Sequence, residues 1–302
     1  MTDSPTPEIK LSVLIVTYNS AADIEPCLAA INFSGSYEII IIDNASQDRT
    51  RPLLTTSPAL TRHPNHQLIF NPKNFGYARA NNQGLALARG EYILLLNPDT
   101  VPEPDALNLL VRFLDTNPEV AAVAPQLINP DRTVQPSIRS FPTFSSVLLE
   151  LTGLPRLFPH SRRLNAWRRR DLNYQQFQFV DQPMASCLLC RRQVLTDLGG
   201  FDQQFPIYYN DVDLCYRLRQ QGGKIAYLPE AKVVHKLGAS TSKVKPKMIY
   251  ENHRSLFRFL KKHNPGPIFL PKAVILLPLL ELSALARALL HRLKNWVYTR
   301  KE

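Results

Sequence analysis

The sequence predicts an α/β protein with a mostly parallel central sheet and a C-terminal helical extension. Short apolar runs suited to buried strands alternate with helical patterns, turn residues follow the apolar runs, and the C-terminal part has two helical patterns separated by a Pro-Gly-Pro break. Because strands that alternate with helices pair in parallel, their carboxyl ends should share one edge of the sheet. Ligands of open α/β sheets bind at that edge.

The expected elements follow one another along the first half of the chain. Apolar runs predict buried strands at residues 11–17, 38–43, 67–70, 92–96 and 120–124. Helical patterns lie between them at residues 21–30, 76–88 and 106–115. Right-handed crossovers would then bring four strand ends to one edge of the sheet: Thr17, Asp43, Asn71 and Asn97.

The composition is that of an ordinary globular protein and leaves three classes of partner. The chain has 302 residues, of which 44% are hydrophobic and 20% charged, so it can bury the core of one large or two small domains. Its 36 Lys and Arg against 25 Asp and Glu give a formal net charge of +11. A basic surface suits phosphate-bearing ligands, nucleic acid or anionic lipid, and charge alone does not choose among them.

The cysteines indicate a reducing compartment. Four cysteines are too few and too scattered for a disulfide framework, and no secretory signal precedes Lys10. Cys187 and Cys190 lie in an apolar run with no second pair to complete a zinc site, so we expect two packed thiols. The simplest location is the cytoplasm.

The segment EYILLLNPDT, residues 91–100, carries the strongest single indication of a site. An apolar run stops at Asn97, Pro98 and Asp99. Because Pro98 cannot continue a strand ladder, we expect the chain to turn out of the sheet there and to expose Asp99. A carboxylate at the end of a buried strand can reach a metal ion or a substrate.

The end of the first strand argues against two common nucleotide sites. A dinucleotide site needs a Gly-rich turn there, but the sequence is Thr17, Tyr18, Asn19, Ser20, and no phosphate loop ending in Gly-Lys-Ser/Thr occurs. Tyr18 offers an aromatic face to a base, and Asp43 offers an acceptor to a base or ribose. The alternative is that Tyr18 packs on the following helix and Asp43 caps a turn.

Four segments in order carry a family resemblance. They are LSVLIVTYNS, EIIIIDNASQD, NPKNFGYARANNQGLALARGEYILLLNPDT and GGFDQQFPIYYNDVDLCYRLRQQG. Together they are similar to family 2 inverting glycosyltransferases with the GT-A nucleotide-sugar-binding fold, especially the rhamnosyltransferase-like members, from about Leu11 to about His235. The resemblance implies a catalytic domain at residues 1–245, with a basic excursion at about 130–180, and a helical extension at 246–302.

The resemblance also implies a donor and metal site. The residues expected to bind the nucleotide-sugar donor are Thr17, Tyr18, Asp43, Asn74, Gly76 and Asn97. Asp99 is expected to bind Mg²⁺ or Mn²⁺, which neutralises the leaving diphosphate, and His235 fits a position where many members place a His near the metal. Asn97 stands where the family has an acid, so we expect weaker metal binding, or help from another side chain. The alternative for His235 is a strand-end His with no ligand.

Asp211 is the candidate catalytic base, which would take the proton from the attacking acceptor hydroxyl. The family usually has Glu-Asp where this chain has Asn210-Asp211. Asp213 competes for the role, but residues two apart do not share a helix face, so only one can face the donor. The alternative makes Asp211 a helix N-cap and Asp213 a first-turn acid favoured by the helix dipole.

The remaining segments predict partners. The excursion contains an arginine cluster, Arg162–Arg163 and Arg168–Arg170, which could cover an anionic acceptor or form a solvated basic face. A basic helix is expected at 247–263 and an apolar one at 273–290, interrupted by Pro278, Glu281 and Arg287. Its apolar face predicts an interfacial helix, or one docked on the protein's own core or a second subunit. That face comprises Leu282, Leu285, Leu289, Leu293 and Trp296.

The predicted function is transfer of a hexose, with rhamnose from dTDP-rhamnose as the donor that the resemblance implies, to a hydroxyl of a growing, lipid-linked, cell-surface glycan. The enzyme would be peripherally associated with the inner face of the plasma membrane. A noncatalytic nucleotide- or glycan-binding protein that keeps the fold is the alternative, because Asn97 and Asn210 both replace acids. No basic motif interleaved with aromatic residues supports nucleic-acid binding.

Overall fold

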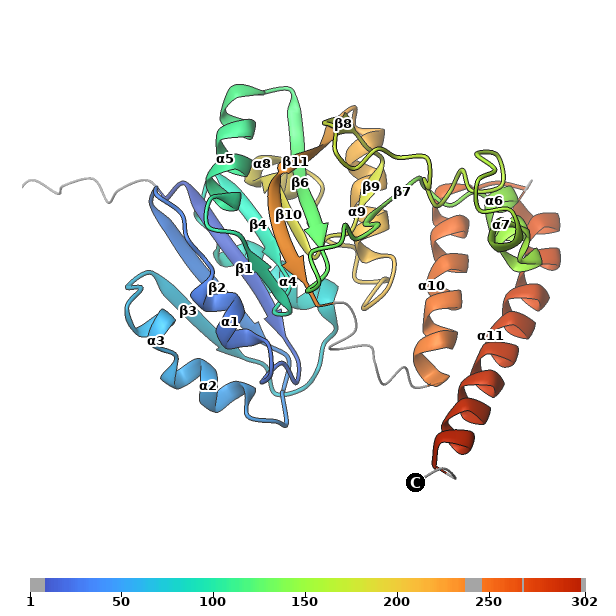
Figure 1. Ribbon diagram of the computed structural model, residues 1–302, viewed down its shortest axis with the longest axis horizontal. Coiled ribbons are helices and arrows are strands. Elements are labelled where there is room, and N and C mark those ends of the chain that lie inside the picture. Colours follow the sequence, from blue (N-terminus) through green and yellow to red (C-terminus); the bar gives the residue numbers. More distant parts are fainter. Residues whose placement is uncertain (1–8, 237–245, 268, 300–302) are drawn as a thin grey trace, which may run out of the picture. The chain divides into compact units, whose positions relative to one another are not determined.

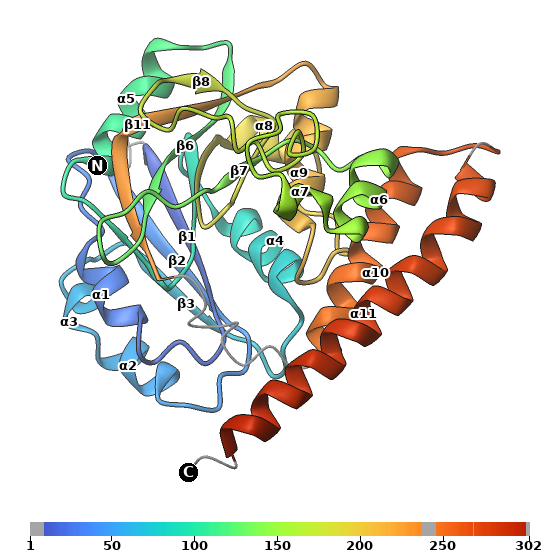
Figure 2. The ribbon, with the colours of Figure 1, turned by 45° about the vertical axis from the view of Figure 1, so that its right-hand side comes forward.

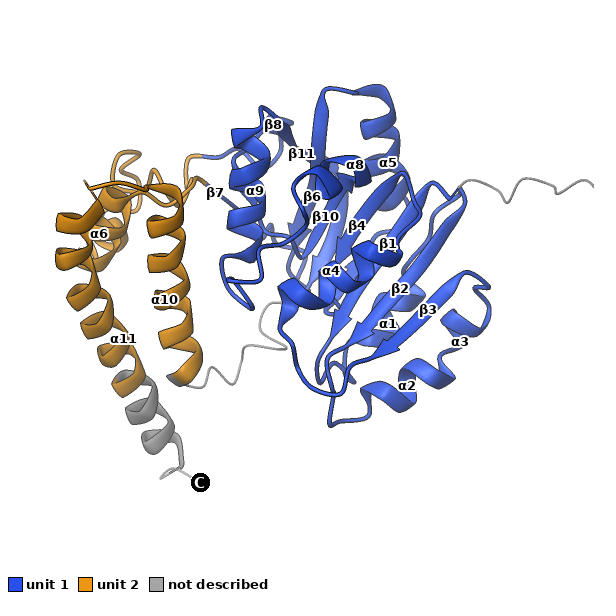
Figure 3. Cartoon of the chain, turned by 180° about the vertical axis from the view of Figure 1, so that it is seen from behind, with its two compact units in different colours: residues 1–139, 172–240 blue, residues 140–171, 241–302 orange. Residues whose placement is uncertain are grey.

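The structure is a computed structural model that describes residues 9–236, 246–267 and 269–299, with the side chains of 246 and 290–299 excepted (Figure 1). The chain divides into two compact units. Unit 1 comprises residues 1–139 and 172–240, and unit 2 comprises residues 140–171 and 241–302 (Figure 3). The segment 140–171 thus belongs with the C-terminal helices.

Unit 1 is built on one mixed sheet of nine strands (Figures 1 and 2). Its order is β3 (His66–Phe70), β2 (Tyr37–Asp43), β1 (Leu11–Thr17), β4 (Tyr92–Leu96), β10 (Cys187–Arg191), β6 (Val120–Ile128), β11 (Lys224–His235) and β5 (Thr100–Pro102), and β8 (Gln178–Phe179) pairs with β11. The first four strands are parallel, whereas β10 and β5 are antiparallel to their neighbours. The prediction of a mostly parallel α/β sheet is confirmed.

The strand register confirms the predicted edge. Thr17 lies level with Asp43, and Asp43 with Phe70, in the parallel pairs of β1 with β2 and β2 with β3. Ile15 pairs with Leu96, so β4 ends close to the same level. The reason is that each strand is a buried apolar run that stops at a polar residue. The strand ends therefore meet at one edge.

Helices cover both faces of the sheet. Side chains of α1 (Ile24–Ala29), α3 (Pro58–Thr61) and α5 (Ala106–Thr116) join the core on the face of Val13 and Leu94. On the other face α4 (Tyr77–Leu87) approaches closely enough that a Cβ at Gly84 would meet Ile42 at 2.8 Å. The first predicted helix is shorter than expected, because residues 20–23 form a turn in which the N–H groups of Asp23 and Ile24 donate to the Ser20 carbonyl.

Strand β10 was not predicted from sequence. It inserts between β4 and β6 from a distant part of the chain, and Cys187, Leu188, Leu189 and Cys190 are all buried. All four cysteines are free and buried, and burial raises the pKa of the Cys190 thiol to about 12. The prediction of packed thiols is confirmed.

The remaining elements of unit 1 flank the sheet. They are α2 (Thr50–Thr56), α8 (Arg192–Asp197), α9 (Asn210–Gln220) and a two-stranded ribbon of β7 (Ile138–Arg139) with β9 (Gln182–Pro183). Helix α9 packs against β9, which places the ribbon beside the helix that carries Asp211.

Unit 2 is helical, with α6 (Phe144–Thr152), α7 (Leu154–Leu157), α10 (Pro246–His263) and α11 (Phe269–Thr299). Helices α10 and α11 run side by side, joined by Phe257 against Phe269 and by His253 Nε2 3.3 Å from Ser283 Oγ (Figures 1 and 2). The segment Phe269–Leu289 is long and apolar enough to cross a membrane by length and composition, and 22% of its most apolar window is buried.

Candidate functional site

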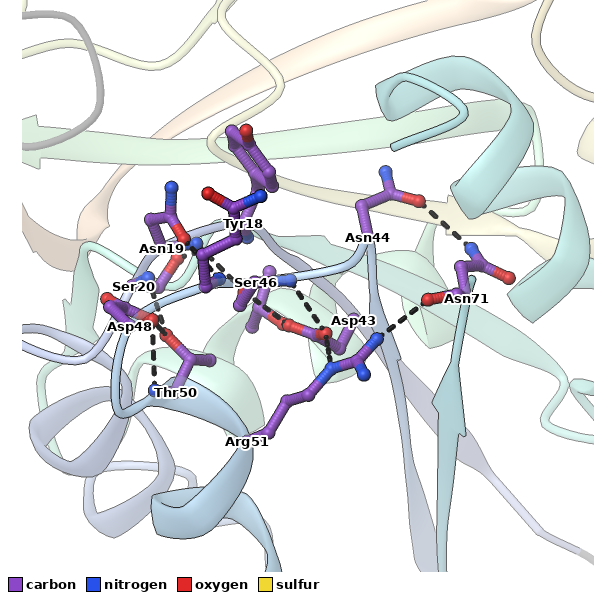
Figure 4. Close-up of polar contacts among 12 residues, drawn as sticks. Tyr18, Asn19, Ser20, Asp43, Asn44, Ser46, Asp48, Thr50, Arg51 and Asn71 are labelled. Carbon is purple, nitrogen blue, oxygen red and sulfur yellow. Dashed lines mark hydrogen bonds and ion pairs between the residues drawn. The ribbon is translucent and has the colours of Figure 1, made fainter. Parts of the chain in front are cut away.

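The buried carboxylate of Asp43 organises the loop after β2 (Figure 4). Its Oδ1 accepts hydrogen bonds from Thr17 Oγ1 at 2.9 Å and from Ser46 Oγ. Its Oδ2 accepts from Ser46 N at 3.0 Å and from Arg51 Nε at 2.6 Å. A carboxylate has about four acceptor positions. Protein donors therefore already use the acceptor capacity of Asp43, and a nucleoside would meet the groups around it.

Arg51 is the residue in this network that the sequence did not point to. Its Nε bonds Asp43 and its Nη2 donates to the Asn71 carbonyl at 2.7 Å, so one guanidinium joins the ends of β2 and β3 (Figure 4). It also lies 5.3 Å from the Phe70 ring centroid. No local pattern pairs Arg51 with Asn71, because the contact depends on the parallel register of two strands.

Tyr18 presents its ring at the same edge. The side chain is 45% exposed and Figure 4 shows it projecting away from the Asp43 network. The next residue, Asn19, has φ 54°, and its N–H donates to Ser46 Oγ at 2.9 Å. This turn directs Tyr18 outward, so its aromatic face is available for stacking.

Gly76 and Asn74 form a second turn near this edge. Asn74 Oδ1 accepts from Gly76 N at 2.8 Å, and Asn44 Nδ2 donates to the Gly76 carbonyl at 3.1 Å. Gly76 has φ 86°, and a Cβ there would lie 2.8 Å from the Pro206 carbonyl. That carbonyl also accepts from Tyr77 N at 2.6 Å. Glycine is required because both the backbone conformation and the space exclude a side chain.

The turn after β4 corrects the expected exposure of Asp99. Its side chain is buried, with the residue 8% exposed, because β5 starts directly after it and pairs with β11. The Asp99 carbonyl accepts from Lys236 N at 3.0 Å, which ties the turn to the end of β11. The proline does end the strand as predicted, but the chain folds back onto the sheet instead of leaving it.

His235 lies beside Asp99 because strand pairing sets Thr100 opposite His235. His235 Nε2 is 3.6 Å from Asp99 Oδ1, and its Nδ1 is 2.7 Å from Gln135 Oε1. Gln135 Nε2 donates to Asn129 Oδ1 and to the His235 carbonyl, so its Oε1 must accept from Nδ1. In neutral His235 the Nε2 lone pair then faces a carboxylate. An imidazole nitrogen and a carboxylate oxygen placed in this way are both ligand types for a divalent cation.

Asn97 supplies an unsatisfied acceptor in the same turn. Its Oδ1 is buried and has no hydrogen-bond partner within the part of the chain that the structure describes. An orphaned buried oxygen is unfavourable unless a ligand completes it. No group of three or more His, Cys, Asp or Glu side chains within the described ranges is placed to hold a metal ion. A cation site here would therefore use the amide oxygen of Asn97 with Asp99 and His235.

Helix α9 separates the two candidate bases. Asp213 is fully buried, and its Oδ2 lies 2.7 Å from Arg217 Nε. Arg217 also donates to the carbonyls of Leu198 and Gly200, each at 2.8 Å. Asp213 therefore fixes Arg217, and Arg217 in turn holds the Gly-Gly turn at 199–200. Neither acid is the N-cap, since that position is Tyr209 with φ 65°.

Asp211 occupies a different environment. It is half-buried, and burial raises the pKa of its carboxyl, whereas N–H groups of Val212 and Ala185 and the charge of Arg139 act to lower it. Arg139, on β7, is exposed and has no ion-pair partner among the residues described. A carboxylate with a raised pKa is a stronger base than an ordinary aspartate. Sequence reasoning missed Arg139 because a ribbon far along the chain positions it.

Tyr77 connects the two acidic positions. Burial raises the pKa of its phenol, and the charges of Asp211 and Asp99 raise it further. Both carboxylates thus lie within electrostatic reach of one phenol at the start of α4. Asp99, after β4, and Asp211, at the start of α9, therefore lie near the same side chain of unit 1.

The fold of this chain is the GT-A fold. A mannosyltransferase from Pyrobaculum calidifontis, solved in complex with GDP-Man and Mn²⁺, superposes with a TM-score of 0.59 at 22% sequence identity, covering 94% of this chain and 76% of that one. The mixed sheet and its strand order agree with this likeness, and the expected GT-A fold is confirmed.

The chain belongs to glycosyl transferase family 2, whose family model matches residues 12–198. It is 29% identical over 269 residues to the N-acetylglucosaminyl-diphospho-decaprenol L-rhamnosyltransferase of Mycobacterium tuberculosis, covering 85% of each chain. It is 23% identical over 197 residues to the rhamnosyltransferase WbbL of Escherichia coli K12, covering 62% of this chain and 71% of that protein. The family resemblance seen in the sequence is confirmed.

Proposed function

We propose that this glycosyltransferase moves a hexose, rhamnose from dTDP-rhamnose, to a hydroxyl of a lipid-linked glycan with inversion at the anomeric carbon. The observation that carries the proposal is the turn after β4, where Asp99 Oδ1 lies 3.6 Å from His235 Nε2 beside the unsatisfied Asn97 Oδ1. Asp211, distant in sequence, acts with Asp99 on the pKa of the same Tyr77 phenol. The rhamnosyltransferase relatives support the donor, and the diphospho-decaprenol substrate named for one of them supports a lipid-linked acceptor.

Asp211 acts as the base. Its raised pKa favours taking a proton from the acceptor hydroxyl as that oxygen attacks the sugar. The backbone N–H groups of Val212 and Ala185 orient the carboxylate, and the Arg139 charge stabilises its ionised form. Proton removal by a positioned carboxylate contributes about 10²–10⁴ to the rate.

Asp99, His235 and Asn97 would hold a divalent cation. The oxygens of Asp99 and Asn97 are ligand types of Mg²⁺ and Mn²⁺, and a neutral imidazole nitrogen suits Mn²⁺. The fit rests on the unsatisfied Asn97 Oδ1 and on the His235 Nε2 that faces Asp99. When bound, the cation would neutralise charge on the departing diphosphate. Gln135 keeps His235 in the tautomer that presents Nε2.

The Tyr18 ring and the loop around Asp43 would bind the nucleoside. Tyr18 supplies a stacking face, and the Asp43 network with Thr17 and Arg51 holds the loop in place. Asn74 and Gly76 would lie along the donor, because Gly76 leaves the space that a side chain would occupy. We also infer that the enzyme works at the inner face of the plasma membrane, where a lipid-linked acceptor is found.

The test uses purified full-length chain with dTDP-rhamnose, Mn²⁺ and a lipid-linked acceptor. Wild type should release dTDP and extend the acceptor, and Asp211→Asn should lose turnover while retaining donor binding. Asp197→Asn is the matched control, because Asp197 is an exposed acid whose Oδ1 accepts from Gln193. Equal turnover of wild type and Asp211→Asn would contradict the role of the base. Donor binding without turnover in wild type would favour the noncatalytic alternative.

A further inference from the structure

The positive charge of the chain is concentrated in unit 2. Residues 140–171 and 241–302 contain 19 Lys and Arg against 5 Asp and Glu, a formal net charge of +14. Unit 1 contains 17 Lys and Arg against 20 Asp and Glu, a net charge of −3. The catalytic unit is thus slightly acidic, and the whole basic excess of the chain belongs to the helical unit. A separation of this size points to an anionic partner of unit 2.

Exposed apolar side chains are concentrated in the same unit. On α11, Leu270 is 68% exposed, Val274 73%, Ile275 54%, Leu282 61% and Leu285 47%. The opposite stripe of α11 is buried within unit 2 and comprises Phe269, Leu276, Leu280, Ala284 and Ala288. The outward arc between Leu270 and Leu289 contains only one acidic residue, Glu281. An apolar arc of this length is typical of a helix that contacts lipid.

Helix α10 presents a stripe of cations. Lys247, Arg254 and Lys261 are exposed and recur every seven residues, so they lie along one line of the helix. None of the three has an ion-pair partner within the described part of the chain. Uncommitted cations on a helix beside an apolar helix are the pattern that attracts anionic lipid headgroups.

The packing of α10 on α11 argues against a membrane crossing. His253 and Phe257 of α10 contact Ser283 and Phe269 of α11, so the two helices share most of the apolar segment. If α11 crossed a bilayer, α10 would have to enter with it. Lys or Arg at a bilayer centre is strongly unfavourable, and α10 carries several. Only the outward arc of α11 is then free to enter the lipid.

We propose that unit 2 binds the surface of an anionic phospholipid bilayer, with α11 lying in the plane of the interface and its outward arc inserted, while the α10 cations bind lipid phosphates. The purpose of this binding rests on the proposed function, because it would bring unit 1 to a lipid-linked acceptor. The binding itself does not depend on the transfer reaction. The commitment to anionic lipid follows from the +14 charge of unit 2.

The test measures co-flotation of the purified full-length chain with vesicles, without donor or acceptor. Phosphatidylcholine vesicles are compared with vesicles that also contain phosphatidylglycerol, at low and high salt. We expect strong binding to the anionic vesicles only, weakened by salt. Neutralising Lys247, Arg254 and Lys261 to Gln should weaken binding on the order of 100-fold, because each cation contributes about fivefold.

Matched variants control for fold and for total charge. The triple Gln variant of Arg49, Arg112 and Lys232 removes the same charge from exposed positions of unit 1 and should bind vesicles within about twofold of wild type. Leu282→Gln with Leu285→Gln should weaken binding to anionic vesicles, because both side chains lie on the exposed arc. The Tm of each variant is first checked to equal that of wild type.

Several outcomes would overturn the proposal. One is equal, salt-independent binding to both vesicle types. A second is unchanged binding of the α10 variant. Retention on membranes after an alkaline carbonate wash would indicate a crossing helix. A dimer that buries the exposed arc of α11 and dissociates in the Leu282→Gln variant would show that a second copy of the chain, and not lipid, covers this arc. Because Asp211→Asn should bind vesicles like wild type, failure of the transfer reaction and failure of lipid binding are distinguishable.

Discussion

Replacing Asp213 by Asn tests how helix α9 divides its two acids. Asp213 is fully buried and its Oδ2 is 2.7 Å from Arg217 Nε. Arg217 in turn bonds the carbonyls of Leu198 and Gly200. The Asn side chain would leave the guanidinium largely buried without its counter-charge. The variant should therefore lose stability rather than chemistry.

The structure sets the size of the effect. Breaking a buried ion pair by removing one partner costs about 3–5 kcal/mol. The Arg217 side chain is 17% exposed and keeps two carbonyl partners, so we expect the lower end, about 3 kcal/mol. For a unit of this size, that corresponds to a fall in Tm of about 6–12 °C. Scanning calorimetry measures the Tm, and transfer is assayed well below it.

Asp211→Asn is the matched variant, because it makes the same chemical change two residues away. Burial raises the pKa of the Asp211 carboxyl in the folded protein. The unfolded carboxyl ionises at lower pH, so the folded state loses stability as pH rises from the ordinary aspartate value through the raised one. Removing the charge should thus leave Tm unchanged or higher at neutral pH. Transfer should fall about 10²–10⁴-fold.

The opposite pattern would refute this reasoning. If Asp213→Asn lost turnover at an unchanged Tm, while Asp211→Asn melted early and stayed active, Asp213 would be the base and Asp211 the structural acid. If both variants only lost stability, neither carboxylate would act on the acceptor.

Three further predictions concern the donor site and the base. Tyr18→Ala should raise the donor KM about 5- to 100-fold through lost stacking, with Tyr18→Phe near wild type, and an unchanged KM for the Ala variant would exclude stacking. Gly76→Ala should lower the free energy of unfolding more than Gly153→Ala, which should lower it by about 1 kcal/mol. The reason is that φ is positive at both positions, but only at Gly76 would the new Cβ meet Pro206. Equal losses in denaturant titrations would contradict this. The transfer rate should rise with pH and level off above the raised pKa of Asp211, and a profile flat down to the ordinary aspartate pKa would show that its ionisation does not limit the rate.

Much of the sheet edge could be predicted from local pattern. The strands Leu11–Thr17 and Tyr92–Leu96 were predicted with the bounds that the structure has, because an apolar run that stops at a polar residue is a local signal. Thr17 and Asp43 were correctly expected to lie level. Their proposed contacts with a donor stay predictions, as do the roles of Asp99, His235 and Asp211.

Contacts between distant residues could not be predicted in the same way. The insertion of β10 between β4 and β6 pairs Leu189 with Leu94 and with Val123, and no local pattern carries that choice. For the same reason the sequence did not predict that Arg51 contacts Asp43 or that Gln135 contacts His235. It also produced the wrong expectation that Asp99 is exposed, since β5 covers it only by pairing with β11.

The amino-acid sequence by itself determined the α/β class, the positions of the first strands along the chain and the residue types at their ends. Hydrophobic periodicity and chain-breaking residues act over a few positions, so they can be recognised in the sequence itself. Only the tertiary structure decided which aspartate of α9 is tied to an arginine, which nitrogen of His235 faces Asp99, and which arc of α11 stays exposed. Each of these depends on burial and on pairing between segments far apart in the chain, which are properties of the packed fold.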